Sequence, residues 1–258
     1  MDKTLKRFLI SGFLGSWRQE RKEESQTVFL TREETHHLKN VLRMKERSMC
    51  LLFDQEGNEF VSRLERFLPD GRSEARLIEP VVSSSENLLQ LTVAQAIPQD
   101  RKMDEIVRKA AELGIFELVP LITERTVVRI SQGQMEKVHR RWGRIVEQTL
   151  KQSRLSKSPL IASVVSFDRL CRRFSDYDET FLLHPSSGAK PIREHDCIKK
   201  KETPRRFLLM LGPEGGFSPQ EVSHAKTEGA QVVKMGVGIL KTDTAFVAAT
   251  SFFQLMYS

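Results

Sequence analysis

Cysteine is scarce in this chain of 258 residues, which has only Cys50, Cys171 and Cys197. An odd count without a Cys-x-x-Cys pair suggests neither a disulfide framework nor a zinc site, so no metal is expected. Long apolar runs are also lacking, and the apolar stretch 245–257 is too short to cross a bilayer. We therefore expect a cytoplasmic protein without a membrane segment.

The start of the chain has some features of a secretory signal, but it lacks others. Lys3, Lys6 and Arg7 precede a short apolar stretch at 8–14, and residues 18–24 are densely charged. No small-x-small cleavage pattern follows. We interpret this segment as a first strand and loop.

Positive charge is concentrated in one part of the chain. The formal net charge is +7, yet residues 1–80 carry 15 Lys and Arg against 14 Asp and Glu, whereas residues 101–160 carry 13 against 7. Apolar residues recur there at helical spacing, at Met135, Val138, Trp142, Ile145, Val146 and Thr149. A solvated helix face explains any single cation, but their density favours contact with RNA phosphates, with Arg140, Arg141 and Arg144 as candidates.

Two glycine-rich loops near the end of the chain are its most informative feature. They occupy 212–217 and 236–245, and each follows a short apolar run, at 207–211 and 232–235. Glycine permits positive φ and a close approach of the backbone to a ligand. Two such loops at neighbouring strand ends predict a small-molecule pocket at the carboxyl edge of an α/β sheet.

Known phosphate-binding loops fit these residues poorly. A Walker A loop needs Gly directly before Lys-Thr, where this chain has Leu240, and a dinucleotide fingerprint needs Gly in place of Lys241. Ordinary tight turns would explain either loop alone but explain the pair less well.

The first third of the chain predicts a small β-barrel. Thr31-x-x-Glu34 is a capping-box pattern, and strand-like runs follow at 49–53, 59–67 and 74–78. Gly57-Asn58 and Asp70-Gly71 read as the turns between them. The polar segment 83–87 reads as a linker.

Residues beyond 88 alternate between strand and helix patterns, which predicts a mostly parallel sheet. Strands are expected near 89–96, 116–121, 161–165, 180–183, 207–211 and 232–235, and helices near 101–113, 134–153, 218–228 and 244–257. Ser218-Pro-Gln-Glu221 is a capping box with proline at the first helical position, and Gly229 closes that helix.

The motif GPEGGF, followed after a short spacer by G-x-G-I-L-K-T-D-T-A, resembles the carboxyl-terminal signature of the RsmE family of ribosomal RNA methyltransferases. Further matches follow the family's order along the chain, at Arg7-Phe8, His37 to Arg43, Lys102 to Asp104, Lys109 to Gly114, Glu124-Arg125 and Gln152 to Arg154. The resemblance implies a PUA-like or OB-like RNA-binding barrel over 1–82. It also implies a SPOUT-type α/β methyltransferase domain with a trefoil knot over 88–258.

The resemblance further implies a homodimer that binds S-adenosylmethionine and methylates N3 of a uridine in the decoding region of 16S rRNA, in the small ribosomal subunit. Because N3 of neutral uracil must lose a proton, Asp243 and Glu214 are the acidic candidates, and Lys241 could stabilise the uracil anion or hold a phosphate. By the resemblance, Arg154 at the Gln-Ser-x-Arg position could orient the acceptor, and Arg7 and Arg43 would contact RNA. Cofactor-binding residues would be His184, Leu211, Gly212, Pro213, Gly215, Gly216, Met235, Gly236, Gly238, Ile239, Leu240 and Thr244.

Two departures from the family pattern leave alternatives open. Lys241 and Asp243 stand where the family usually has Arg and Glu, and the approach to Gln152-Ser153-Arg154 differs from the usual alanine-rich one. Glu214 and Asp243 would otherwise serve only as caps of the turn and helix that follow them. The alternatives for the whole protein are an RNA-binding or ribosome-binding protein with little catalysis and an enzyme that methylates a ribose 2′-hydroxyl.

Overall fold

A computed structural model describes residues 5–10, 27–54, 57–81, 89–100, 102–128, 132–152, 157–185, 188–199, 205–236 and 238–257. The predicted linker 83–87 lies outside these residues. The chain forms two compact units, one from Met1–Ser84 with Glu147–Ser158, the other from Ser85–Val146 with Pro159–Ser258.

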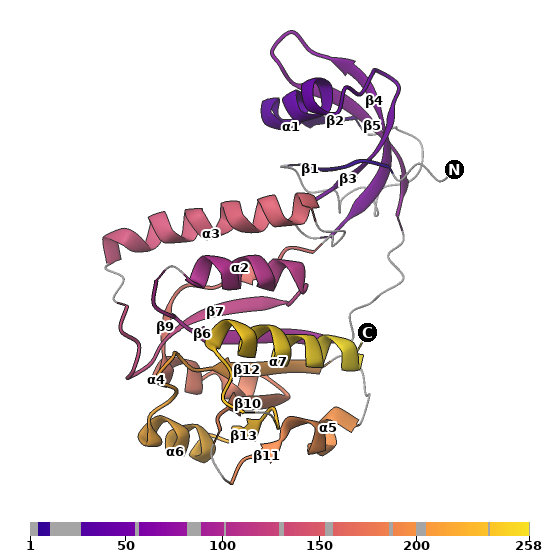
Figure 1. Ribbon diagram of the computed structural model, residues 1–258. Helices are drawn as coiled ribbons and strands as arrows, with labels where there is room; N and C mark the ends of the chain where they lie inside the picture. The colour runs from indigo at the N-terminus through magenta and orange to yellow at the C-terminus, as the bar shows by residue number, and fades with distance from the viewer. Residues whose placement is uncertain are drawn as a thin grey trace. The chain divides into compact units, whose positions relative to one another are not determined.

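The first unit is built on a five-stranded mixed sheet (Figure 1). Its strands are β1 (Arg7–Leu9), β2 (Thr27–Leu30), β3 (Met49–Phe53), β4 (Glu59–Phe67) and β5 (Ser73–Pro80), in the order β1-β3-β4-β5-β2. Among its described strands, β1 and β3 pair in parallel and the other neighbours pair antiparallel. Register shifts between β4 and β5 at Val61/Ser62 and Leu64/Arg66 bend the sheet around a core that includes Phe8, Leu52 and Phe60.

Of the two hydrogen bonds that define a capping box, the described residues show one at Thr31. The Thr31 hydroxyl accepts the Glu34 N–H at 3.2 Å, and helix α1 (Arg32–His36) begins there before a π-helical turn, His37–Val41. The Glu34 carboxylate instead contacts the ammonium of Lys151, which belongs to the second segment of this unit. Burial lowers the pKa of Lys151, but the hydrogen bond and charge of Glu34 outweigh this effect and raise it overall.

The second unit contains a sheet in which every pairing is parallel, as the strand–helix alternation predicts. Its strands are β6 (Leu89–Ala96), β7 (Glu117–Ile122), β8 (Leu160–Ile161), β9 (Val165–Ser166), β10 (Glu179–Leu183), β11 (Lys190–Pro191), β12 (Arg205–Leu211) and β13 (Gln231–Lys234). Their order is β11-β13-β10-β12-β6-β7-β8, and β9 also pairs with β7. The single strand expected at 161–165 is therefore two short strands, β8 and β9.

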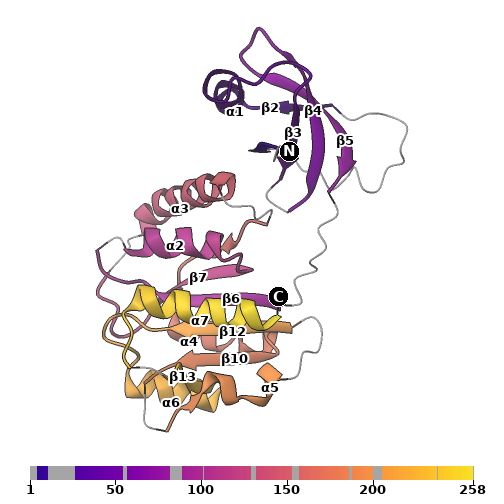
Figure 2. The ribbon, with the colours of Figure 1, turned by 45° about the vertical axis from the view of Figure 1, so that its right-hand side comes forward.

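Helices cover both faces of this sheet because its strands are apolar on both sides. On one face α4 (Phe167–Cys171) and α6 (Pro219–Thr227) pack against Leu182, Leu208 and Met210. On the other face α7 (Thr242–Tyr257) lies against β6 and β12 and contacts α2 (Lys102–Glu112), as Figures 1 and 2 show. There Phe181 and Phe207 meet Phe253 of α7 with ring centroids 5.4 and 5.7 Å away.

Two further helices are α3 (Gln132–Gln152) and the short α5 (Asp196–Lys199). Helix α5 belongs to the second unit, whereas α3 begins in the second unit and its residues from Glu147 onward belong to the first. In α3, the predicted apolar stripe is buried at Trp142, Val146 and Thr149. Within the described ranges, no helix combines the length and apolarity needed to cross a bilayer.

Helix α6 begins with the complete capping box predicted at Ser218. The Ser218 hydroxyl accepts the Glu221 N–H at 3.2 Å, and the Glu221 carboxylate accepts the Ser218 N–H at 2.9 Å. The same carboxylate accepts the N–H of Glu124 at 2.8 Å. Glu221 thus ties the start of α6 to the loop after β7.

Candidate functional site

Both glycine-rich loops lie at the carboxyl edge of the parallel sheet, the place where open α/β sheets bind ligands. Their strands, however, are not neighbours, because β10 lies between β13 and β12. The expectation of neighbouring strand ends is wrong in this respect. The crossover places the end of β10, and with it His184, between the two loops.

The first loop folds into a tight turn that needs its glycines. Gly216 has φ +67° and its N–H donates to the Pro213 carbonyl at 2.8 Å. A Cβ on Gly212 would stand 3.2 Å from the backbone of Gly216. The loop is therefore closely packed on itself, with Leu211 and Pro213 buried and Gly215 exposed.

Three side chains from other parts of the unit hold this loop. At the end of β6 the Gln95 amide donates to the Gly212 carbonyl at 3.4 Å. At the start of α2 the Lys102 ammonium donates to the Glu214 carboxylate at 3.0 Å. After β7 the Arg125 guanidinium donates to the Gly215 carbonyl at 2.7 Å.

Sequence reasoning did not assign a role to any of these three residues. Lys102 and Arg125 lie in segments that match the family pattern, and this match was the sequence feature that could have pointed to a role for them. No local pattern distinguishes Gln95, an amide at the end of an apolar strand. Its fully buried side chain donates both to the Ala96 carbonyl at 2.9 Å and to this loop.

Glu214 is held as an anion by its surroundings. Partial burial raises the pKa of this carboxyl, but hydrogen bonds from its own backbone and from Lys102, with the charge of Lys102, outweigh that effect and lower the pKa overall. A carboxylate with a lowered pKa is a weaker proton acceptor.

The second loop leaves open space beside its glycines. Gly236 has φ +77°, and among the described residues no atom lies within 4 Å of a Cβ built on Gly236 or on Gly238. Met235 and Leu240 are half-buried, whereas the Ile239 side chain is 89% exposed. The second loop is thus more open than the first, with exposed backbone at both glycines.

Lys241 and Asp243 lie where this loop enters α7. The helix begins at Thr242, and the Lys241 carbonyl accepts the Ala245 N–H at 2.8 Å. Asp243 therefore lies inside the first turn and is not the residue that caps the helix, so that alternative for Asp243 is wrong. Asp243 and Thr244 are exposed.

Asp243 belongs to the same charge cluster as Lys102 and Glu214. The pKa of Lys102 is raised mainly by its hydrogen bond to Glu214, and the charge of Asp243 contributes to the same direction. One cation thus lies near both acidic candidates.

Two buried polar atoms at this edge have no hydrogen-bond partner among the described residues, Oε1 of Gln95 and Nδ1 of His184. Burial lowers the pKa of His184, and the charges of Arg125 and Lys226 lower it further, so the ring is neutral at neutral pH. Buried polar groups in proteins are paired as a rule, and such orphans indicate places where a ligand bonds.

The candidate RNA-contacting arginines of α3 differ in their surroundings. Arg140 and Arg144 are exposed, and Arg140 contacts the carbonyl of Glu136 in its own helix at 3.4 Å. Arg141 forms an ion pair with Asp104 of α2. Arg140 and Arg144 are therefore the better placed for phosphates.

The arginines of the first unit also differ. Arg7 is 12% exposed, donates to Glu59 at 2.7 Å and stacks over Phe53 at 4.5 Å, so its charge is already paired and its predicted RNA contact gains no support. Arg43 is exposed, with φ 53°, just after the π-helical turn. Arg154 lies outside the described residues.

Comparisons with known proteins agree with this geometry. The RNA methyltransferase domain family matches residues 85–254, and the RNA methyltransferase PUA domain family matches residues 30–66. The ribosomal RNA small subunit methyltransferase E of Bacillus subtilis is 29% identical over 89% of this chain and 90% of its own length. The protein of the same name from Synechocystis is 32% identical over 85% of this chain and 70% of its own.

A solved structure shows the same fold. The ribosomal RNA small subunit methyltransferase E from Neisseria gonorrhoeae, bound to S-adenosyl methionine, is 27% identical, with a TM-score of 0.80 over 98% of both chains. The parallel sheet with glycine loops at its carboxyl edge, and the small mixed sheet before it, define a SPOUT-type RNA methyltransferase. Within that class, the chain belongs to the ribosomal RNA small subunit methyltransferase E (RsmE) family.

Proposed function

We propose that this protein transfers the methyl group of S-adenosylmethionine to N3 of a uridine in the decoding region of 16S rRNA. The observation that carries the proposal is the convergence of both glycine loops, His184 and Asp243 at one sheet edge. The names of the relatives, ribosomal RNA small subunit methyltransferase E, supply the substrate class.

The residues at this edge suit such a cofactor. The open backbone at Gly236 and Gly238 admits a ligand closely, and the orphaned Gln95 and His184 atoms offer hydrogen bonds to it. S-adenosylmethionine, when bound, supplies a methyl group activated by its sulfonium charge. We propose that these residues hold it together with Leu211, Gly212, Pro213, Gly215, Gly216, Met235, Ile239, Leu240 and Thr244.

The acceptor needs help from the protein, because neutral uracil carries a proton on N3 and is a poor nucleophile there. We propose Asp243 as the base that takes this proton, since Glu214 is engaged with Lys102. Lys241, exposed beside it, would stabilise the uracil anion. Arg154 is assigned to acceptor orientation on the family resemblance alone.

RNA would bind along exposed cations. We propose that Arg140 and Arg144 of α3 contact phosphates and that Arg43 contributes from a PUA-like domain spanning 1–82, with the methyltransferase domain over 88–258. The match to the PUA family at residues 30–66 supports the RNA-binding role of the first part.

We also propose that the protein acts as a homodimer in the cytoplasm. Leu255 on α7 is 76% exposed and Ile239 is 89% exposed, which gives apolar surface suited to a second copy. Sedimentation at micromolar concentration tests this: a dimer that Leu255→Glu turns into a monomer supports it, and a wild-type monomer refutes it.

Two experiments test the function. Mass spectrometry of 16S rRNA from a deletion strain should show loss of one N3-methyluridine, restored by the wild-type gene; loss of a ribose methyl instead would identify a 2′-O-methyltransferase. Calorimetry with S-adenosylmethionine should show binding, whereas its absence would leave an RNA-binding protein without catalysis.

A further inference from the structure

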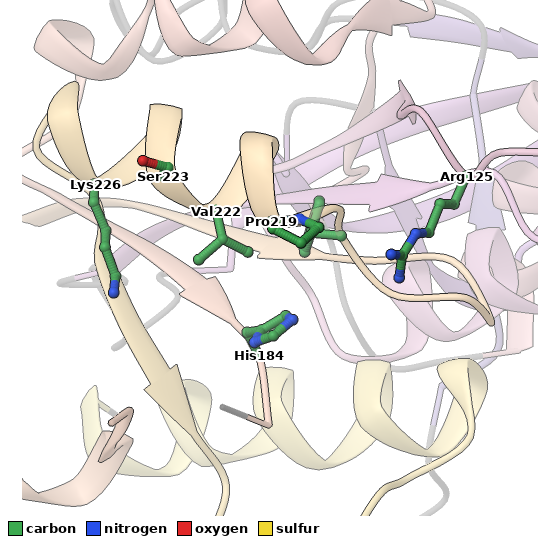
Figure 3. A pocket seen from close by; sticks show the side chains of 7 residues that line it. Arg125, His184, Pro219, Val222, Ser223 and Lys226 are labelled. Carbon is green, nitrogen blue, oxygen red and sulfur yellow. The ribbon is translucent and has the colours of Figure 1, made fainter. Parts of the chain in front are cut away.

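A cavity of about 480 Å³ opens on the α6 side of the sheet edge. It is lined by Arg125, His184, Pro219, Val222, Ser223 and Lys226 (Figure 3), with the buried ring of Phe217. The four α6 residues recur at helical spacing, so one face of α6 forms a wall. None of the described residues between 235 and 241 lines it, which distinguishes it from the second glycine loop.

The charged groups of this cavity are all of one sign. Arg125 and Lys226 lie on opposite sides of His184 in Figure 3. Burial lowers the pKa of the His184 ring, and both charges lower it further. Among the residues that the structure describes, no carboxylate lines the cavity. The nearest acidic residue on α6, Glu221, is buried and its carboxylate already accepts two backbone N–H groups, from Ser218 and Glu124.

Cations without a carboxylate beside them favour an anion. Arginine presents a planar fork of donors that matches a phosphate, and lysine adds a point charge. Ser223 and His184 complete the lining between these two cations. Val222 and the buried ring of Phe217 contribute apolar surface to the same wall.

We propose that this cavity binds one backbone phosphate of the acceptor RNA strand, next to the methyl-transfer site. The proposal rests on the proposed function for its ligand, since a single-stranded RNA brings phosphates to the sheet edge where its base would react. The volume accommodates a phosphate with its neighbouring ribose. Arg125 links the two sites because it also holds the first glycine loop at Gly215.

The test variant is Lys226→Gln, because Lys226 is exposed at the last turn of α6 and forms no ion pair in the described part of the chain. Lys190→Gln, on an exposed strand residue outside the cavity, is the matched control. Binding of a 16S rRNA fragment and of an unrelated single-stranded RNA is measured over a range of salt concentrations. Lys226→Gln should weaken RNA binding by roughly 10- to 100-fold and reduce the slope of log K against log salt by about 1.

Three outcomes decide the proposal. Loss of affinity in Lys226→Gln, with recovery in Lys226→Arg and unchanged affinity for S-adenosylmethionine, supports it. If Lys226→Gln binds RNA as tightly as Lys190→Gln does, the proposal is overturned. It is also overturned if Lys226→Gln loses affinity for S-adenosylmethionine alone, because the cavity would then bind the carboxylate of the cofactor. RNA methylation is assayed separately, so a chain that binds RNA through Lys226 without methylating it would sink the proposed function but not the phosphate site.

Discussion

Lys102 and Glu214 form an ion pair, with nitrogen and oxygen 3.0 Å apart, between residues separated by 112 positions in the sequence. The pair connects the start of α2 to the first glycine loop. It fixes the loop's acidic side chain in place without burying it, since about half of the Lys102 side chain is exposed. An exposed pair of this kind contributes little to stability, so its value lies in position.

Replacing Lys102 by Met should therefore affect turnover more than folding. We expect turnover to fall roughly 10- to 100-fold because the loop loses its alignment, with little change in the melting temperature. Lys109→Met on the same helix is the control. A variant with full turnover would show that the pair is dispensable.

The same pair predicts a dependence on pH. The pKa of Glu214 is lower in the folded than in the unfolded protein, so ionised Glu214 stabilises the fold. This stabilisation is fully present above the ordinary glutamate pKa of about 4.3. It is lost as the pH falls through the pKa of the folded state. Urea unfolding from pH 6 to 3 should show wild type losing more stability than Glu214→Gln. Parallel curves would contradict this.

Substitutions at the two glycines of the second loop can distinguish the effect of backbone strain from that of contact with the ligand. Gly236→Ala places a side chain at φ +77°, which costs about 1–3 kcal/mol and should weaken S-adenosylmethionine binding roughly 5- to 150-fold. Gly238→Ala adds a Cβ into open space without a positive φ, so any loss there reports contact with the ligand.

Gly229→Ala is the control for these two variants, because Gly229 has φ +100° at the end of α6, away from the second loop. It should lower the melting temperature and leave cofactor affinity unchanged. Calorimetry on the folded variants decides, and full affinity in Gly236→Ala would remove the pocket from this loop.

Asp243 can be tested as a base with two conservative changes. Asp243→Asn should cut single-turnover methylation roughly 10²-fold or more with cofactor affinity unchanged, because only the proton acceptor is lost. Asp243→Glu, which restores the usual family residue, should keep most of the rate. Equal rates for Asn and Asp would leave Asp243 no role in proton transfer.

The exposed and paired arginines of α3 should behave differently. Changing Arg140 and Arg144 together to Glu should lower RNA affinity and flatten its salt dependence by about 2 in slope. Arg141→Gln, which breaks an ion pair with Asp104, should affect RNA binding less. The reverse ranking in filter-binding titrations would assign the RNA contact to Arg141.

Two cysteines should be unreactive in the folded protein. Burial raises the pKa of Cys50 to about 12, and burial together with nearby carboxylates raises that of Cys171 to about 12. Only the thiolate reacts, so iodoacetamide at pH 8 should leave both unmodified, and urea should expose them. Peptide mapping that finds either modified in the native protein would contradict this.

Local patterns predicted the longer strands and helices of the second unit because alternation of apolar runs and capped helices is encoded within each segment. The short elements α4, α5 and β11 were not predicted. Ser218 and Glu221 form their capping box as expected, and the run at 207–211 lies in β12. The order of parallel strands is set by crossover connections, which local patterns do not encode. For this reason the position of β10 between the two glycine-bearing strands was not foreseen.

Contacts distant in sequence account for the site residues that were missed. The amide of Gln95 reaches a carbonyl 117 positions away, and nothing around it in the sequence indicates this. The start of α7 lies two residues before the expected position, which moved Asp243 from cap to first turn. Such boundaries depend on tertiary packing as much as on capping residues.

The contact between Glu34 and Lys151 limits how this protein can be divided for study. A gene fragment that stops at residue 84 would express the five-stranded sheet without its second segment, and Glu34, whose side chain is 5% exposed, would keep a carboxylate with no cation beside it. Binding measurements on such a fragment would report on a damaged fold. A fragment of the first unit that keeps its fold needs residues 147–158 fused to residues 1–84, or an uncharged residue in place of Glu34.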